Sequence, residues 1–150
     1  MIAISPRPTV GRTWNTISFA STLYLCPILD LLLAEIPRQW HAEIRLGLQE
    51  ALVNAAKHGN QLDPSKTVVV RFYASSEEYW WVISDQGNGF TCACACNDNP
   101  REKIPHEEGE CGRGLFILHQ IFDRVDWNDN TRELKLCKHF NNTYRLPLVQ

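Results

Sequence analysis

The sequence predicts an α+β fold, a two-layer α/β sandwich in which one mixed, mostly antiparallel sheet carries helices on one face. Three observations lead to this class. The order of segments along the chain is strand, two helices, hairpin, loop, helix and hairpin. Segments rich in β-branched and aromatic residues come in pairs joined by short turns. The longest helical pattern, over residues 38–58, has apolar side chains on one side only.

The first half of the chain predicts one strand and two helices. Residues 13–21 alternate in character as an edge strand does. Residues 27–35 form a short apolar helix. Residues 38–58 form a longer helix, and the Gly59-Asn60 pair that follows is a typical C-terminal stop.

The second half predicts two hairpins separated by an irregular segment. Residues 67–74 and 78–84 form the first hairpin. Residues 91–111 have little periodicity and are expected to form a surface loop. A helix over 115–122 follows. The second hairpin is expected from strands near 132–139 and 143–147, with Asn141 and Asn142 in the turn.

Size and composition limit the classes of protein. The chain has 150 residues, which suits a single domain over 1–150 with a core of about 13–147. It is 44% hydrophobic and 21% charged, as in ordinary globular proteins. The formal net charge of -2 supplies no overall basic field for nucleic acid or anionic lipid.

The termini and cysteines predict a cytoplasmic protein. The N-terminus has no basic start, long apolar core or small-residue cleavage site, so no signal peptide is expected. The most apolar stretch, 23–34, contains Pro27 and Asp30 and is too short to span a bilayer. In a cytosolic chain, the six cysteines are expected to be free thiols, with a metal site as the rarer alternative.

The longer helix brings three polar residues onto one face. At about 100° per residue, with Glu50 at zero, Asn54 lies at roughly 40° and Lys57 at roughly -20°. The opposite side is apolar and is expected to pack on the sheet: Ile44, Leu48, Ala51, Leu52, Ala55 and Ala56. Such a polar face is most often only solvated surface. Asn54 argues for more, because asparagine has a poor helix propensity in mid-helix.

The chemistry of this face suits a metal–phosphate site. The carboxamide oxygen of Asn54 is a neutral hard ligand of the kind that Mg²⁺ accepts. Glu50, one turn earlier, can accept a proton or orient a nucleophile. Lys57 can reach phosphate oxygens as a point charge. His58 lies off this face and is expected to cap or pack.

Two glycine-containing segments complete the pattern. Asp85 follows a predicted core strand, and Gly87 and Gly89 follow it, so its carboxylate can accept a hydrogen bond from an exocyclic amine such as that of adenine. A simple turn after the strand is the common alternative. Further on, Gly112-Arg113-Gly114 leads into the 115–122 helix. Free N–H groups at a helix start attract anions, and Arg113 can bind a terminal phosphate.

Together these three motifs resemble the GHKL ATP-binding superfamily, which includes gyrase-type ATPases, histidine kinases and anti-sigma-factor serine kinases. The resemblance covers about residues 13–147, and the stretch from Glu50 to Gly59 is most similar to the anti-sigma regulatory kinases. It implies a Bergerat-type ATP-binding fold with ATP and Mg²⁺ as cofactors. It also implies that residues 91–111 form a lid.

The resemblance further implies a role for each motif residue. Asn54 would bind Mg²⁺, Glu50 would be the catalytic base, and Asp85 would bind the adenine amine. The four glycines would shape the pocket and lid, and Arg113 would contact the γ-phosphate. The four are Gly87, Gly89, Gly112 and Gly114.

The implied function is a serine/threonine protein kinase that regulates a sigma factor. Such kinases bind a sigma factor and phosphorylate a small STAS-domain antagonist, and a homodimer is implied. Phosphoryl transfer needs mainly positioning and charge neutralisation, which a metal, a lysine and an arginine supply. Two alternatives stay open: a nucleotide-responsive binding module that transfers no phosphate, and a detached ATPase domain that works with another chain.

The lid departs from the family pattern because Cys92, Cys94 and Cys96 alternate within it. With Cys111 or His106 these thiols could bind zinc or another soft metal. Their spacing is not the usual one for structural zinc, so free or redox-active thiols are the favoured interpretation, with a disulfide across the lid as a further hypothesis.

Overall fold

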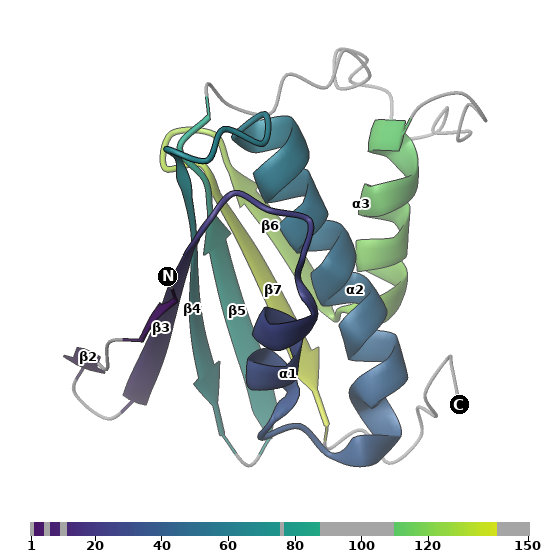
Figure 1. Cartoon of the computed structure of the whole chain (residues 1–150). Helices are drawn as coiled ribbons and strands as arrows, with labels where there is room; N and C mark the ends of the chain where they lie inside the picture. Colours follow the sequence, from purple (N-terminus) through teal and green to yellow (C-terminus); the bar gives the residue numbers. More distant parts are fainter. Residues whose placement is uncertain (1, 5–6, 10–11, 76, 88–109, 141–150) are drawn as a thin grey trace.

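The computed structural model describes residues 2–4, 7–9, 12–75, 77–87 and 110–140 (Figure 1). Of residues 3, 4, 7–9, 12 and 110–113 it describes the backbone alone. The strands form one sheet in the order β1-β3-β4-β5-β7-β6, with β2 also paired to β3. Every pairing between described strands is antiparallel. The strands are β1 (Ala3–Ile4), β2 (Arg7–Thr9), β3 (Arg12–Ala20), β4 (Thr67–Ala74), β5 (Glu78–Ser84), β6 (Arg124–Asn128) and β7 (Glu133–His139).

The helices cover one face of this sheet (Figure 1). They are α1 (Cys26–Leu33), a short 3₁₀ turn η1 (Arg38–Trp40), α2 (His41–Val53), a π-helical segment η2 (Asn54–Gly59) and α3 (Glu110–Ile121). η1, α2 and η2 follow one another without interruption, and α2 packs against α3. The predicted α+β class, with helices on one face of a sheet, is therefore confirmed.

The core lies between the sheet and the helices. Strand residues alternate, so Ile17, Val70, Trp81 and Leu136 point toward the helices and are fully buried or nearly so. All six apolar residues predicted for the back of the long helix are buried in the same core. The polar front of that helix is thereby directed away from the sheet.

The end of the sheet differs from the sequence-based expectation. β7 forms its hairpin with β6, which had not been predicted, and pairs on its other side with β5. Both edges of β7 are thus occupied over 133–137, so the predicted hairpin of 132–139 with 143–147 is wrong in its pairing. Residues 143–147 lie outside the described residues. β6 was missed because most of its side chains are exposed, which leaves little hydrophobic alternation to detect.

Two further expectations need correction. β3 is not an edge strand, since β1 and β2 pair along one side of it and β4 along the other. α3 begins at Glu110, so Gly112-Arg113-Gly114 lies within its first turns and not in a loop before it. The low helix propensity of glycine is a weak preference that tertiary packing overrides here, because Gly114 is buried against α2.

A buried ion pair joins α2, α3 and the sheet. The Lys138 ammonium lies 3.1 Å from Glu43 Oε1, and both side chains are almost completely inaccessible to water. Lys138 Nζ also donates to the Ile121 carbonyl at 2.6 Å and lies 4.7 Å from the centre of the Trp40 ring. Lys138 therefore lies on the helical side of β7, whereas Cys137 and His139 point to the other face of the sheet.

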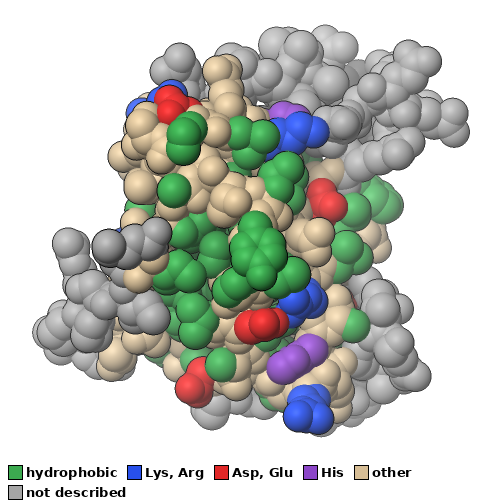
Figure 2. All heavy atoms as spheres, viewed as in Figure 1, with side chains coloured by type: hydrophobic (Ala, Val, Ile, Leu, Met, Phe, Trp, Pro, Cys, Tyr) green, Lys and Arg blue, Asp and Glu red, His purple; other side chains and the backbone are tan. Residues whose placement is uncertain are grey.

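Some apolar side chains stay at the surface of the helical face, among charged ones (Figure 2). Around α1, Leu23, Tyr24 and Leu31 are 52%, 73% and 40% exposed. Within the described residues, no helix combines the length and apolar character needed to cross a membrane.

Candidate functional site

Glu50 and Asn54 meet the start of α3 at one point. Both side chains are half-buried, and Gly114 of α3 is buried against them. A methyl group on Gly114 would lie 3.0 Å from Asn54 Nδ2 and 3.6 Å from Glu50 Oε2. The absence of a side chain at Gly114 therefore leaves room beside these two polar groups.

Neither polar group has a hydrogen-bond or ion-pair partner within the part of the chain that the structure describes. Among those residues, the Glu50 carboxylate and the Asn54 carboxamide form no hydrogen bond or ion pair. Their polar atoms are not cut off from water, so both groups remain available to a ligand. The pair fits a hard cation and phosphate oxygens, with the amide oxygen and the carboxylate as the available ligands.

The helix changes type at Asn54. From Asn54 to Gly59 it is a π-helix, and the Asn60 N–H donates to the Ala55 carbonyl, five residues back. Segments of this kind are often found at functional sites. The spacing of 100° per residue does not apply beyond Asn54, so the angle that placed Lys57 on the shared face is not valid. Lys57 is exposed.

The predicted strand-end motif packs directly on the end of this helix. Asp85 follows β5, and its Oδ1 accepts a hydrogen bond from the Gly87 N–H at 2.8 Å. A side chain on Gly59 would overlap the Asp85 carboxylate, and one on Gly87 would overlap the Gly59 carbonyl. Close approach of two backbone segments therefore requires both glycines. Within the described residues Asp85 Oδ2 has no hydrogen-bond partner, so it can still accept one from a ligand.

Asn60, which the sequence marked only as a helix stop, holds these segments together. Its side chain is fully buried. Its Nδ2 donates to Ser21 Oγ at 2.8 Å and to the Thr67 carbonyl at 2.9 Å. Its Oδ1 accepts from the Gln86 N–H at 2.7 Å. One amide thus connects the ends of β3 and η2, the start of β4 and the segment after β5, and the sequence carried no signal for this role.

The two clusters lie at successive positions of one helix. Glu50, Asn54 and Gly114 form the first cluster, and Gly59, Asp85 and Gly87 form the second. Asn54 and Gly59 lie at the two ends of the π-helical segment, about one turn apart. An elongated ligand with an anionic end and an amine-bearing end matches this arrangement.

The remaining predicted residues are only partly described. Cys111, Gly112 and Arg113 lie in the first turn of α3, where the backbone N–H groups have no acceptor inside the helix. Their side chains are outside the described residues, as are Gly89 and the cysteines at 92, 94 and 96. Their roles, and those of Glu50, Asn54, Lys57 and Asp85, stay predictions.

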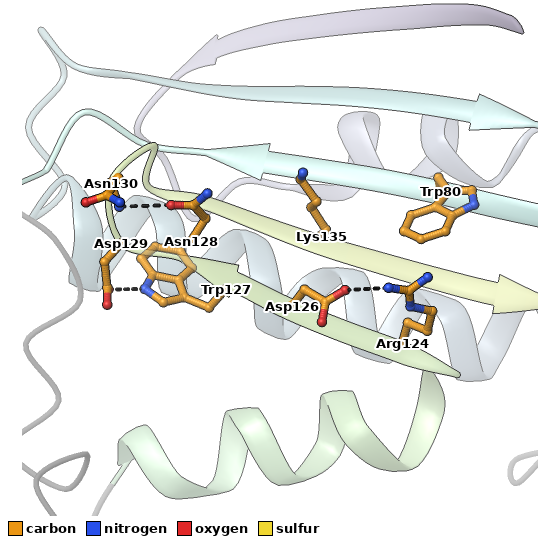
Figure 3. A pocket seen from close by; sticks show the side chains of 8 residues that line it. All are labelled: Trp80, Arg124, Asp126, Trp127, Asn128, Asp129, Asn130 and Lys135. Carbon is orange, nitrogen blue, oxygen red and sulfur yellow. Dashed lines mark hydrogen bonds and ion pairs between the residues drawn. The ribbon is translucent and has the colours of Figure 1, made fainter.

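A separate cavity lies on the open face of the sheet (Figure 3). Its volume is about 620 Å³, and it contains none of the predicted site residues. The Arg124–Asp126 ion pair and the hydrogen bond from the Trp127 indole to Asp129 lie along it (Figure 3). Its lining residues are Trp80, Arg124, Asp126, Trp127, Asn128, Asp129, Asn130 and Lys135. The cavity belongs to β5, β6 and β7 and is separate from the polar face of α2.

Comparison with known proteins defines the class. Residues 30–138 match the family model of the histidine kinase-like ATPase domain, so the chain belongs to this family. The matched range includes both clusters described above. Membership makes the protein an ATP-binding domain of the GHKL type.

Similarity to individual proteins is weaker. The chain is 30% identical over 137 residues to the multifunctional CCA protein of two strains of Vibrio vulnificus, which covers 85% of this chain and 29% of that protein. It is 28% identical, with the same coverage, to the multifunctional CCA protein of Aliivibrio salmonicida. The chain thus spans less than a third of the length of these relatives.

Proposed function

We propose that this protein is an ATP- and Mg²⁺-dependent serine/threonine kinase of the anti-sigma regulatory type. Its substrate would be a serine or threonine of a STAS-domain antagonist, and it would sequester a sigma factor. The observation that carries the proposal is the Glu50 carboxylate, half-buried beside Asn54 and Gly114 with no partner among the described residues. A domain that only binds nucleotide needs no base at this position.

The residues have distinct roles in this proposal. Bound ATP supplies the phosphoryl group. Asn54 holds Mg²⁺ through its amide oxygen, and the N–H groups that begin α3 bind phosphate oxygens together with Arg113. The free oxygen of Asp85 accepts a hydrogen bond from the adenine amine. Glu50 accepts the proton of the attacking hydroxyl, a role that typically contributes 10²–10⁴-fold to the rate.

The partner and its location are part of the same proposal. The exposed apolar residues around α1 offer area for contact with another protein, such as a sigma factor or a second copy in a homodimer. A cytoplasmic location follows from such partners. Sedimentation of the purified protein, alone and with each partner, tests this part separately from the chemistry.

The experiment incubates the protein with Mg²⁺, γ-labelled ATP and purified STAS-domain partners. We expect label on a partner serine or threonine. Glu50→Gln should lower transfer by 10²–10⁴-fold while ATP still binds, and Asn54→Ala should abolish Mg²⁺-dependent ATP binding. Glu77→Gln makes the same chemical change at an exposed residue before β5, at the opposite end of that strand from Asp85, and should change neither.

Three other results would favour an alternative function or contradict the role of Glu50. ATP binding without transfer to any partner would favour the nucleotide-responsive binding module. Transfer or hydrolysis only in the presence of a separate accessory chain would favour the detached ATPase domain. Unchanged phosphoryl transfer in Glu50→Gln would show that Glu50 is not the general base.

A further inference from the structure

Three potential metal ligands converge on the open face of the sheet, away from the helices. Cys137 and His139 lie two residues apart on β7, so their side chains point to the same face. Lys138, between them, points to the helical side, where it contacts Glu43 and the Ile121 carbonyl. Glu78 of β5 lies directly opposite His139 in the antiparallel register. Side chains in such cross-strand pairs are close neighbours.

The donor atoms are close enough to share one ion. One ligand atom from each of Glu78, Cys137 and His139 lies within 4.8 Å of the other two. His139 Nε2 is 3.7 Å from Cys137 Sγ, whereas its other ring nitrogen, Nδ1, is 3.7 Å from Glu78 Oε2, so one nitrogen would bind the ion and the Glu78 carboxylate would turn toward it. An ion about 2.3 Å from the sulfur and about 2.0 Å from Nε2 would form an angle of roughly 120° between them, close to tetrahedral.

The protein backbone already holds this arrangement. The His139 N–H donates to Asp123 Oδ2 at 2.7 Å, and the Asp123 N–H donates to the Cys137 carbonyl at 2.8 Å. The Cys137 side chain is fully buried, whereas those of His139 and Glu78 are 46% and 24% exposed. The thiol is therefore fixed, while the other two ligands face water and can adjust to an incoming ion.

The surrounding charges favour a cation. Glu78 and Asp123 are acidic neighbours of the Cys137 thiol, and Arg124 is the basic one. Arg124, directly opposite Cys137 on β6, pairs with Asp126 and lies over the ring of Trp80, with its guanidinium carbon 5.4 Å from the ring centre (Figure 3). Burial first, and then the acidic neighbours, raise the pKa of Cys137 to about 12.

We propose that Glu78, Cys137 and His139 form a binding site for Zn²⁺, with the fourth coordination position open to water. A thiolate, an imidazole and a carboxylate suit Zn²⁺, whereas Mg²⁺ prefers oxygen ligands alone. The site is thus chemically distinct from the proposed Mg²⁺ site at Asn54, and it does not depend on the kinase proposal. By joining the start of β5 to the end of β7 the ion would stabilise the fold.

The test uses Co²⁺ as a spectroscopic probe, because a thiolate ligand gives a charge-transfer band that no oxygen ligand gives. The cysteines at 92, 94, 96 and 111 are first replaced, so that they cannot contribute. This background carries Cys92→Ser, Cys94→Ser, Cys96→Ser and Cys111→Ser. We expect one equivalent of Co²⁺ to produce the band, and Zn²⁺ to remove it and raise the melting temperature.

Matched variants locate the ligands. Cys137→Ser should abolish the band, and His139→Gln and Glu78→Gln should weaken Co²⁺ binding at least about 10-fold. Cys26→Ser, at an exposed cysteine of α1, should have no effect. Since Cys137→Ser alters a buried residue, the exposed His139→Gln variant gives an answer even if the former does not fold. Absence of the band, or a band that survives His139→Gln at full affinity, would overturn the proposal.

Discussion

Asn60→Ala should both destabilise the protein and make the segment after β5, which carries Asp85, less firmly held. The substitution removes three hydrogen bonds that a fully buried side chain makes to Ser21, Thr67 and Gln86. The Ser21 hydroxyl keeps its own bond to the Lys66 carbonyl at 2.9 Å. Two backbone groups, the Thr67 carbonyl and the Gln86 N–H, lose a partner.

The magnitude follows from these two groups. Each buried group left without a partner costs about 1–3 kcal/mol. Because Thr67 is half-buried and the Gln86 side chain is exposed, hydrogen bonds to water offset part of this cost. We expect a loss of about 3 kcal/mol in the free energy of unfolding, or roughly 6–12 °C in melting temperature for a chain of this size.

Urea unfolding followed by tryptophan fluorescence measures the loss, and equilibrium titration measures ATP affinity. Ser21→Ala removes one of the three bonds and also the bond from the Ser21 hydroxyl to the Lys66 carbonyl, which still accepts from the Ser21 N–H. It is the matched control, with an expected loss of about 1–2 kcal/mol. ATP affinity should fall in Asn60→Ala at temperatures where the variant is fully folded, and should be unchanged in Ser21→Ala. A loss below about 1 kcal/mol in Asn60→Ala would refute the free-energy cost assigned to the lost hydrogen bonds. Normal ATP affinity in the folded variant would refute the positioning role.

Three further predictions test other parts of the molecule. Lys138→Met removes the ammonium that lies 3.1 Å from the buried Glu43 carboxylate and should cost about 3 kcal/mol in urea unfolding. The double variant with Glu43→Leu should recover most of this loss, and equal stability of the two variants would contradict the prediction. Gly114→Ala should leave the helix intact but bring a methyl group to 3.0 Å from Asn54 Nδ2, so ATP affinity should fall at least about 10-fold; unchanged affinity would place the nucleotide elsewhere. Folding raises the pKa of Cys137 from 9.0 to about 12 and so favours the protonated thiol. Its contribution to stability is complete below pH 9 and is lost as the pH rises toward 12, by about 1.4 kcal/mol per pH unit. Unfolding in a chelator should show this slope relative to Cys137→Ala, and parallel curves for the two proteins would contradict it.

Much of the fold was predictable because its patterns are local. The hairpin of β4 and β5 was predicted with its observed bounds, since β-branched and aromatic residues mark both strands. The buried side of α2 was predicted because a helix with one apolar side repeats that side every three to four residues. β6 carries no such pattern, and its pairing with β7 depends on where α3 directs the chain.

The candidate site was predictable in its residue types and not in its geometry. Spacing on a helix placed Glu50 and Asn54 on one face, because they are a single turn apart. The same calculation does not apply to Lys57, because the helix changes to a π-helix where its end packs against the segment after β5. Asn60 had no signature in the sequence, since its three partners lie at residues 21, 67 and 86.

The sequence by itself determined the α+β class, the apolar side of the long helix and the three motifs that define an ATP-binding domain. These depend on residue types and short spacings, which act within one element. Only the tertiary structure decided that Gly114 lies against Glu50 and Asn54, that Lys138 is buried with Glu43, and that Glu78 meets Cys137 and His139. Each of these contacts joins residues far apart in the chain, and their side chains meet only after the sheet has paired and the helices have packed on it.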